Sequence, residues 1–125
     1  MAAFADGRSE SVGESLSRAR IRELGLVVPE LQVEVSDRSG RVGRVDFWWP
    51  DVRLVGEFDG RVKYRTDGLD DSRALEERVW AEKVREDRLR ATGRAVVRWT
   101  WGTALDPKRL YAHLSAAGVR RAGRS

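Results

Sequence analysis

Residues 44–64, RVDFWWPDVRLVGEFDGRVKY, carry the clearest structural signal in the chain. The stretch is rich in residues that favour strands and a buried position, namely Val45, Phe47, Leu54, Val55 and Phe58. Between these apolar groups stands Trp49-Pro50-Asp51, a composition typical of a tight turn. We therefore predict two short strands that fold back on each other at this turn.

Three carboxylates stand in this apolar setting, Asp46 on the first strand and Glu57 and Asp59 on the second. Side chains alternate between the two faces of a strand, so Glu57 and Asp59 should share one face. Adjacent strands are about 5 Å apart, which would bring Asp46 close to both. Because such acids repel one another and lose hydration, their proximity favours a divalent cation among them. Asp59-Gly60 is also typical of a hairpin turn, which gives Asp59 a structural interpretation as well.

The composition indicates one domain with a hydrophobic core. The 125 residues are 41% hydrophobic and include five tryptophans, and the 35% of charged residues are interleaved with apolar ones. The absence of cysteine excludes disulfides and thiolate-bound zinc, and a single histidine argues against a histidine-rich metal site or a Ser-His-Asp triad. No apolar run approaches the roughly 20 residues of a membrane span, and no signal-peptide pattern is present. We therefore expect a cytoplasmic protein without membrane contact.

Periodicity and capping residues predict the remaining elements. Helices are expected over residues 10–24, 72–91 and 107–117, and further strands over residues 31–35 and 94–101. The first three strands would form an antiparallel meander. The predicted fold class is α/β, with core order αβββαβ, a mixed four-stranded sheet flanked by helices, and an extra C-terminal helix. Residues 9–118 would form this single domain, with flexible tails at 1–8 and 119–125.

The charge balance suggests a polyanionic substrate. The formal net charge is +4, although the central stretch is acidic. A basic protein with an acidic cluster suits a substrate that is itself negative and is handled through a metal ion. A bias toward arginine in the coding sequence would explain the net charge equally well.

Hydrolysis of a phosphodiester bond would use these residue types. It needs a metal ion that activates water, a cation near the attacked phosphorus and a groove for the nucleic-acid backbone. Asp46 and Glu57 are the candidate metal ligands, with Asp59 and Glu14 as further oxygen ligands or as holders of the water. Lys63 lies just beyond the third strand of the meander, which carries Glu57, and is the nearest candidate cation. Oxygen ligands suit Mg²⁺ or Mn²⁺ better than zinc.

The order of elements resembles that of the PD-(D/E)XK nuclease superfamily. The resemblance covers roughly residues 9–105, and it is carried by the helix with Glu14, then VDFWWP, GEFDGRVKY, the charged helix AEKVREDRLRATG and the strand AVVRWTW. Within the superfamily the chain looks like the very-short-patch-repair-like (Vsr-like) endonuclease branch. It is similar to the C-terminal domain of actinobacterial proteins labelled AbiEi-type antitoxins.

The resemblance implies a restriction-endonuclease-like core with a defined site. In such families an acid of the first helix, the Asp of the second strand and the acid of the third strand bind Mg²⁺, and a lysine assists. By position these residues are Glu14, Asp46, Glu57 and Lys63.

Two positions depart from the family pattern. Val45 stands where the family has a proline before the Asp, and Asp59 stands where the (D/E)XK triplet has its lysine. Lys83 or Arg85, on the following helix, could project the cation into the site instead of Lys63.

The hypothesis is a Mg²⁺- or Mn²⁺-dependent DNA endonuclease, acting in DNA repair or in defence against phage and mobile elements, without an organic cofactor. Residues expected to support the ligands are Glu82, Lys83 and Arg85, and those expected to contact DNA are Arg61, Lys63 and Arg65. The alternative is a catalytically degenerate nucleic-acid-binding domain, or an antitoxin-like regulatory domain, on the same fold.

Overall fold

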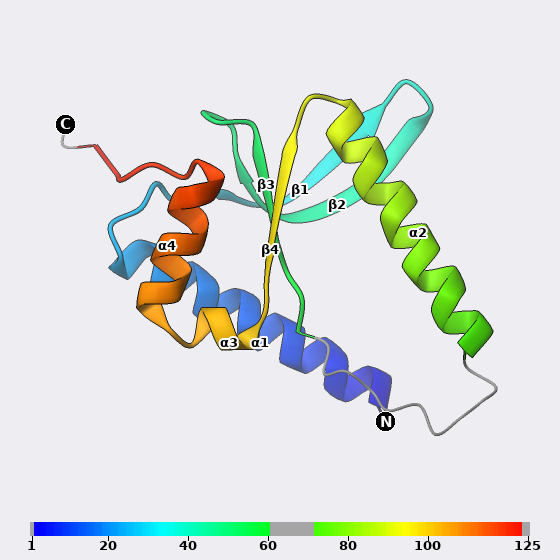
Figure 1. Ribbon diagram of the computed structural model, residues 1–125, viewed down its shortest axis with the longest axis horizontal. Helices are drawn as coiled ribbons and strands as arrows, with labels where there is room; N and C mark the ends of the chain where they lie inside the picture. The colour runs from blue at the N-terminus through cyan, green and yellow to red at the C-terminus, as the bar shows by residue number, and fades with distance from the viewer. Residues whose placement is uncertain (1, 61–71, 124–125) are drawn as a thin grey trace.

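The computed structural model describes residues 2–60 and 72–123, with side chains from residue 10 onward. The elements are α1 (Ala2–Glu23), β1 (Glu30–Asp37), β2 (Gly40–Trp49), β3 (Leu54–Phe58), α2 (Ser72–Ala91), β4 (Ala95–Trp99), α3 (Trp101–Ala104) and α4 (Pro107–Ala117). Figure 1 shows α2 on one side of the sheet and α1, α3 and α4 on the other. Among the helices of the described residues, none combines the length and the apolar character needed to cross a membrane.

The four strands form one mixed sheet in the order β1-β2-β3-β4. β1 pairs with β2 and β2 with β3 in antiparallel fashion, whereas β4 runs parallel to β3. Between β2 and β3 the chain reverses where the N–H groups of Val52 and Arg53 donate to the carbonyls of Trp49 and Pro50. The predicted meander, the mixed four-stranded sheet and its flanking helices are thus confirmed.

The predicted bounds of α2 and α4 are also confirmed. α4 begins where the side chain of Asp106 accepts hydrogen bonds from two backbone N–H groups, with Pro107 in the first helical position. It ends at Gly118, whose φ of 111° lies in the left-handed region that favours glycine. The local signals at both ends of this helix were sufficient to place it.

The sheet face toward α1, α3 and α4 is a continuous apolar core. Its large members are Ile21, Phe47, Trp49, Phe58, Trp99, Leu110 and Leu114. Two indole N–H groups in this core have partners, since Trp49 Nε1 donates to the carbonyl of Val27 at 2.7 Å and Trp99 Nε1 donates to Ser17 Oγ at 2.8 Å. Because buried donors are rarely left unpaired, these bonds help to fix α1 and the loop after it against the sheet.

Two glycines let the backbone approach this core closely. A Cβ at Gly13 of α1 would lie 2.1 Å from the ring of Phe58, and a Cβ at Gly56 of β3 would lie 2.7 Å from the ring of Trp49. Non-bonded carbon atoms normally approach only to about 3.5 Å, so neither position has room for a side chain. The close contact at Gly13 holds α1 against the end of β3, and this brings the acidic residues of α1 to the sheet.

The sheet face toward α2 is apolar only beside the C-terminal part of that helix. There Leu89 packs with Val35, Val45 and Val55. Toward its N-terminal end, α2 extends away from the sheet, and its side chains become exposed (Figure 1). The uncovered strand positions are polar, and a cleft lies over them.

The segments before and after the predicted domain have defined backbone structure in the described residues. α1 already begins at Ala2, which agrees with the high helix propensity of the alanine-rich residues 2–5. Residues 119–123 lie against the loop after α1, where Val27 N donates to the carbonyl of Arg120 and Ala122 N to that of Gly25. Val119 is buried, so this segment contacts the core at its first residue.

The fourth strand is shorter than expected. β4 ends at Trp99, and Trp101 is the first residue of α3. The ring of Trp101 meets that of Phe58 edge to face, with 5.3 Å between the ring centroids. The helical turn carries Trp101 around the sheet end onto this aromatic partner, which strand periodicity could not predict.

Candidate functional site

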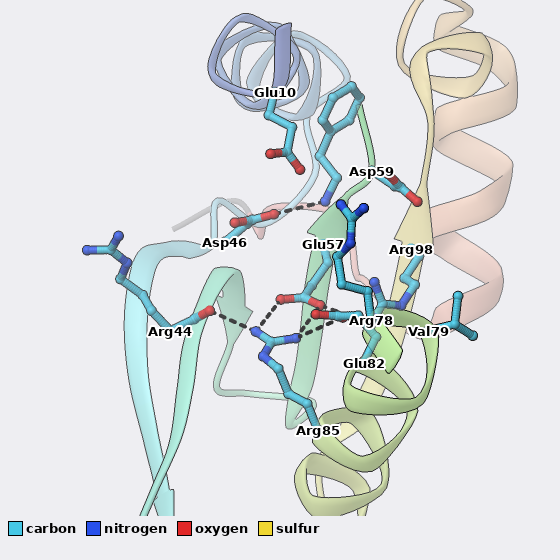
Figure 2. A pocket seen from close by; sticks show the side chains of 11 residues that line it. Glu10, Arg44, Asp46, Glu57, Asp59, Arg78, Val79, Glu82, Arg85 and Arg98 are labelled. Carbon is cyan, nitrogen blue, oxygen red and sulfur yellow. Dashed lines mark hydrogen bonds and ion pairs between the residues drawn. The ribbon is translucent and has the colours of Figure 1, made fainter. Parts of the chain in front are cut away.

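A cleft of ≈ 530 Å³ opens between the sheet and the middle of α2. Its acidic lining comes from four elements and consists of Glu10, Asp46, Glu57, Asp59 and Glu82. The arginines that share it are Arg44, Arg78, Arg85 and Arg98. In Figure 2, Arg85 and Arg98 converge on Glu57, whereas Asp46 points toward Glu10.

Asp46 and Glu57 stand side by side on neighbouring strands. In the antiparallel pairing of β2 with β3, Phe47 lies opposite Gly56. Asp46 precedes Phe47 and Glu57 follows Gly56, so these two acids are cross-strand neighbours on one face. Oδ2 of Asp46 accepts a hydrogen bond of 3.0 Å from the backbone N–H of Phe58. The structure therefore brings together the two acids on which the sequence hypothesis depends.

The carboxyl group of Asp46 also meets that of Glu14 on α1. Both residues line a smaller depression of ≈ 200 Å³ beside the cleft, and their carboxyl groups are hydrogen-bonded to each other. Burial, the negative charges of Asp46 and Glu10, and the bond to Asp46 raise the pKa of Glu14 to about 7. A hydrogen bond of 3.0 Å from Gln32 Nε2 opposes this shift. Below about pH 7 Glu14 is therefore mostly protonated, and its carboxyl group is then the donor toward Asp46.

The pKa of Asp46 is raised as well. Burial is the main cause and the charge of Glu57 adds to it, while the hydrogen bond from the Phe58 N–H opposes it. Because the pKa values of both adjoining carboxyl groups are raised, two negative charges at this position are unfavourable. A cation bound there would offset the repulsion.

Glu57 has a different environment, because arginines neutralise it. The residue is only 6% exposed, and its two oxygens accept hydrogen bonds of 2.9 Å and 2.8 Å from the two Nη atoms of Arg85. Nη2 of Arg98 lies 3.3 Å from Oε1 of Glu57, because the parallel register places Arg98 directly beside it. Bidentate pairs of this kind are strong and directional. In this arrangement the carboxylate of Glu57 is therefore not open to a metal ion.

The predicted metal set of Asp46, Glu57 and Asp59 does not converge. Within residues 2–60 and 72–123, no three acidic, histidine or cysteine side chains are grouped so that they could hold a metal ion. The pairing of Glu57 with Arg85 is the physical reason. Asp46 and Glu14 remain as a pair of carboxyl groups in contact, and one or two carboxylates with several waters is the usual protein environment of Mg²⁺.

Two further expected residues lie in the cleft. Asp59 follows β3 directly, and its backbone N–H donates to the carbonyl of Trp99 at 2.8 Å. Glu82 lies 3.7 Å from Arg85 and 3.2 Å from Arg98, so it forms ion pairs with both arginines.

The structure describes two of the cations that were predicted to serve the site, Lys83 and Arg85. Lys83 is not among the described residues that line the cleft, and its Nζ lies 3.9 Å from Asp87 one turn further along α2. Lys63, the first candidate cation, and the two proposed DNA contacts Arg61 and Arg65 lie outside the described residues. Of the expected cations, Arg85 alone is seen in the cleft in the part of the chain that the structure describes.

Sequence reasoning missed Arg98 and Glu10. Arg98 interrupts the otherwise apolar run of β4, AVVRW, and such a charge in a strand at the middle of a domain signals a partner on the same face. Glu10 stands one helical turn before Glu14, so the two acids share a face of α1. Both signals were present in the sequence, and neither was used.

Two proteins of Mycobacterium tuberculosis are similar to part of the chain. They are uncharacterised proteins of strain CDC 1551 / Oshkosh and strain H37Rv, and each is 48% identical to the chain over 56 residues. The match covers 45% of this chain and 21% of each relative, so the chain spans about a fifth of the length of the relatives it matches. No family model and no solved structure matches the chain.

Proposed function

We propose that this domain is a metal-dependent DNA endonuclease built on the restriction-endonuclease-like core that its order of elements resembles. The reaction would be hydrolysis of a phosphodiester bond with Mg²⁺ or Mn²⁺. DNA repair and defence against phage or mobile elements are the processes that such an activity would serve.

The contact between the carboxyl groups of Glu14 and Asp46, beside the cleft that the arginines line, carries this proposal. A network that served stability alone would pair each acid with a base. Among the described residues, neither Glu14 nor Asp46 forms an ion pair, whereas the neighbouring Glu57 has two. The unpaired acids could bind a cation, and the nearby arginines could bind an anion. A phosphodiester with a bound metal ion supplies both charges.

Different residues of the chain would bind the metal ion, stabilise the phosphate and orient the water. Mg²⁺, when bound, would lower the pKa of a water molecule and neutralise charge on the phosphate. Asp46 and Glu14 would hold the ion, and the N–H of Phe58 would keep the carboxylate of Asp46 in place. Arg98, on the strand beyond Glu57, would stabilise charge that develops on the phosphate. Asp59, which lines the same cleft, is the candidate for orienting the water.

A combined binding and cleavage experiment tests the proposal. Calorimetric titration with Mg²⁺ and Mn²⁺ should show binding, and the same protein should cut plasmid, single-stranded or mismatched DNA in the presence of the metal. Asp46→Asn should abolish binding and reduce cleavage at least a hundredfold, because the amide removes the charge that holds the ion.

Asp51→Asn is the matched control. Asp51 lies in the turn after the same strand, and its carboxylate lies 3.3 Å from Arg120 at a distance from the cleft. The substitution makes the same change of charge and should leave metal binding and cleavage as they are in the wild type. Undiminished cleavage by Asp46→Asn would contradict the proposed site.

The second candidate is a nucleic-acid-binding or antitoxin-like regulatory domain that has lost catalysis on the same fold. The bidentate pairing of Glu57 with Arg85 favours it, since this acid is one of those that the resembled families use as a metal ligand. Such a domain would retain DNA at low salt with the same affinity in Mg²⁺ and in chelator, or would bind a protein partner instead. Metal-independent DNA binding without cleavage would decide for this candidate.

A further inference from the structure

The carboxylate of Glu57 occupies a preformed anion site. Arg85 donates to both of its oxygens, and Arg98 approaches one of them from the adjacent strand. A guanidinium presents a planar fork of donors that fits a carboxylate and a phosphate with the same geometry. An arginine pair that holds Glu57 in this way could therefore hold a phosphodiester phosphate instead.

The two guanidinium groups are fixed by contacts outside Glu57. Nη2 of Arg85 also donates to the carbonyl of Arg44 at 2.8 Å, and Nε of Arg98 donates to Glu86 at 3.0 Å. These bonds come from β2 and α2, so the anion site would keep its shape after Glu57 left it. Preorganised donors of this kind bind an anion with little reorganisation.

Asp46 lies beside Glu57 on the neighbouring strand, and it contacts Glu14 on its other side. In the protein without a cation, movement of Glu57 toward these acids is opposed by repulsion, which keeps it on the arginines. A divalent cation on Asp46 would reverse the sign of that interaction. Glu57 would then be drawn toward the cation and away from the arginines.

On the basis of the function proposed above, we propose that Glu57 is an internal stand-in for a DNA phosphate at Arg85 and Arg98. A divalent cation beside Asp46 would release Glu57 from these arginines. Cation binding and DNA binding are then coupled through one carboxylate, and each ligand strengthens the other. The metal-free protein holds its phosphate site closed. Glu57 is thereby a positioning residue for the phosphate as well as a candidate metal ligand.

Fluorescence anisotropy of a labelled DNA oligonucleotide tests this coupling. Ca²⁺ replaces Mg²⁺ in the assay so that the DNA remains intact, and EDTA provides the metal-free state. We expect wild-type affinity to rise roughly 5- to 150-fold from EDTA to Ca²⁺, the usual range for coupled sites. In Glu57→Gln the neutral amide no longer competes with phosphate, so the DNA should bind tightly in EDTA and the Ca²⁺ effect should shrink to less than twofold.

Two substitutions on α2 provide a matched pair that does not depend on the folding of Glu57→Gln. Arg88 stands one turn after Arg85 and makes an equivalent bidentate pair, with Asp37, outside the cleft. Both Arg85→Gln and Arg88→Gln remove one charge and one carboxylate partner. We expect Arg85→Gln to weaken DNA binding in Ca²⁺ at least tenfold more than Arg88→Gln.

Calorimetry with Ca²⁺ on the same preparations separates this inference from the proposed function. If the protein binds Ca²⁺ but its affinity for DNA is the same in Ca²⁺ and EDTA, the stand-in role of Glu57 is overturned while the metal site remains. Equal losses of DNA affinity in Arg85→Gln and Arg88→Gln would also overturn it. A protein that binds neither Mg²⁺ nor Ca²⁺ would overturn the proposed function, and this inference with it.

Discussion

The two faces of the sheet come from the same strands but have opposite characters. Toward α1 and α4, Phe47, Phe58 and Trp99 form a closed aromatic core. Toward α2, the alternate positions Asp46, Glu57 and Arg98 carry charge and line a cleft. One face is therefore tightly packed and the other is open, although the two differ by only one step along each strand.

The difference indicates how this small domain can hold unfavourable charges in place. The clustered carboxyl groups of Glu14 and Asp46 destabilise the folded state when both are ionised. The aromatic face supplies the rigid background against which such a cluster persists, since α1 is held there by Gly13 and Ser17. We therefore expect substitutions on the packed face to affect folding strongly, and substitutions in the cleft to affect folding weakly but binding strongly.

Gly13→Ala should produce the largest loss of stability. Alanine would favour the helix by about 1 kcal/mol at an exposed position, but here its Cβ would lie 2.1 Å from the Phe58 ring. The overlap forces α1 away from β3, and we expect the free energy of unfolding to fall by about 3 kcal/mol. Chemical denaturation followed by tryptophan fluorescence measures the change.

Two further variants separate overlap from other effects of alanine. Gly102→Ala in α3 is the control, because its Cβ would have no neighbour closer than 3.8 Å, and it should be neutral or slightly stabilising. Phe58→Leu shortens the ring that Gly13→Ala would strike. The double variant should therefore be more stable than the sum of the two single losses predicts, and strict additivity would contradict the proposed overlap.

Ser17→Ala should have the next largest effect. The hydroxyl of Ser17 is fully buried, accepts from Trp99 Nε1 at 2.8 Å and donates to the carbonyl of Gly13 at 2.7 Å. Alanine leaves the indole N–H buried without a partner, which should destabilise the fold by about 2 kcal/mol. Ser115→Ala, at an exposed position of α4, should change the free energy of unfolding by less than about 0.5 kcal/mol. Equal effects of the two substitutions would show that the buried hydrogen bond contributes nothing.

The contrast between the faces also explains what could be predicted from the sequence. Alternation along β2 and β3 was sufficient to place Asp46 beside Glu57, because strand periodicity and one turn determine which side chains share a face. Capping residues were sufficient to place α4. These features depend on neighbours within a few residues or on one local reversal of the chain.

The rest depends on contacts between distant segments. The pairing of Glu57 with Arg85 requires the approach of α2 to the sheet, and no local pattern gives the angle of that approach. The docking of Val119 and Arg120 beside Val27 likewise requires two loops to meet. The prediction of a metal site from three nearby acids therefore missed one contact, because Arg85 of α2 forms an ion pair with Glu57.

The smallest expected effect on stability lies in the cleft and has a characteristic pH dependence. The pKa of Glu14 is raised from 4.5 to about 7 in the folded protein, so between these values the folded state binds more protons than the unfolded state. Stability must therefore fall as the pH rises from about 4.5 to about 7, and the loss is complete above that range. Glu14→Gln removes this penalty while keeping a donor toward Asp46. Because Glu14 is partly exposed and screened by water, we expect a gain of about 1 kcal/mol at pH 8.

Urea denaturation at pH 5 and pH 8 isolates this effect from any general effect of the substitution. At pH 5 most of the carboxyl groups at position 14 are protonated in the folded wild type, so the variant and the wild type should differ little. Glu23→Gln, near the exposed end of the same helix where Glu23 contacts Arg20, should shift stability equally at both pH values. If Glu14→Gln instead gave the same change at pH 5 and pH 8, the charge on Glu14 would not oppose folding. The cleft side of the sheet would then differ from the packed face in shape alone, and its acids would gain no stability from a bound cation.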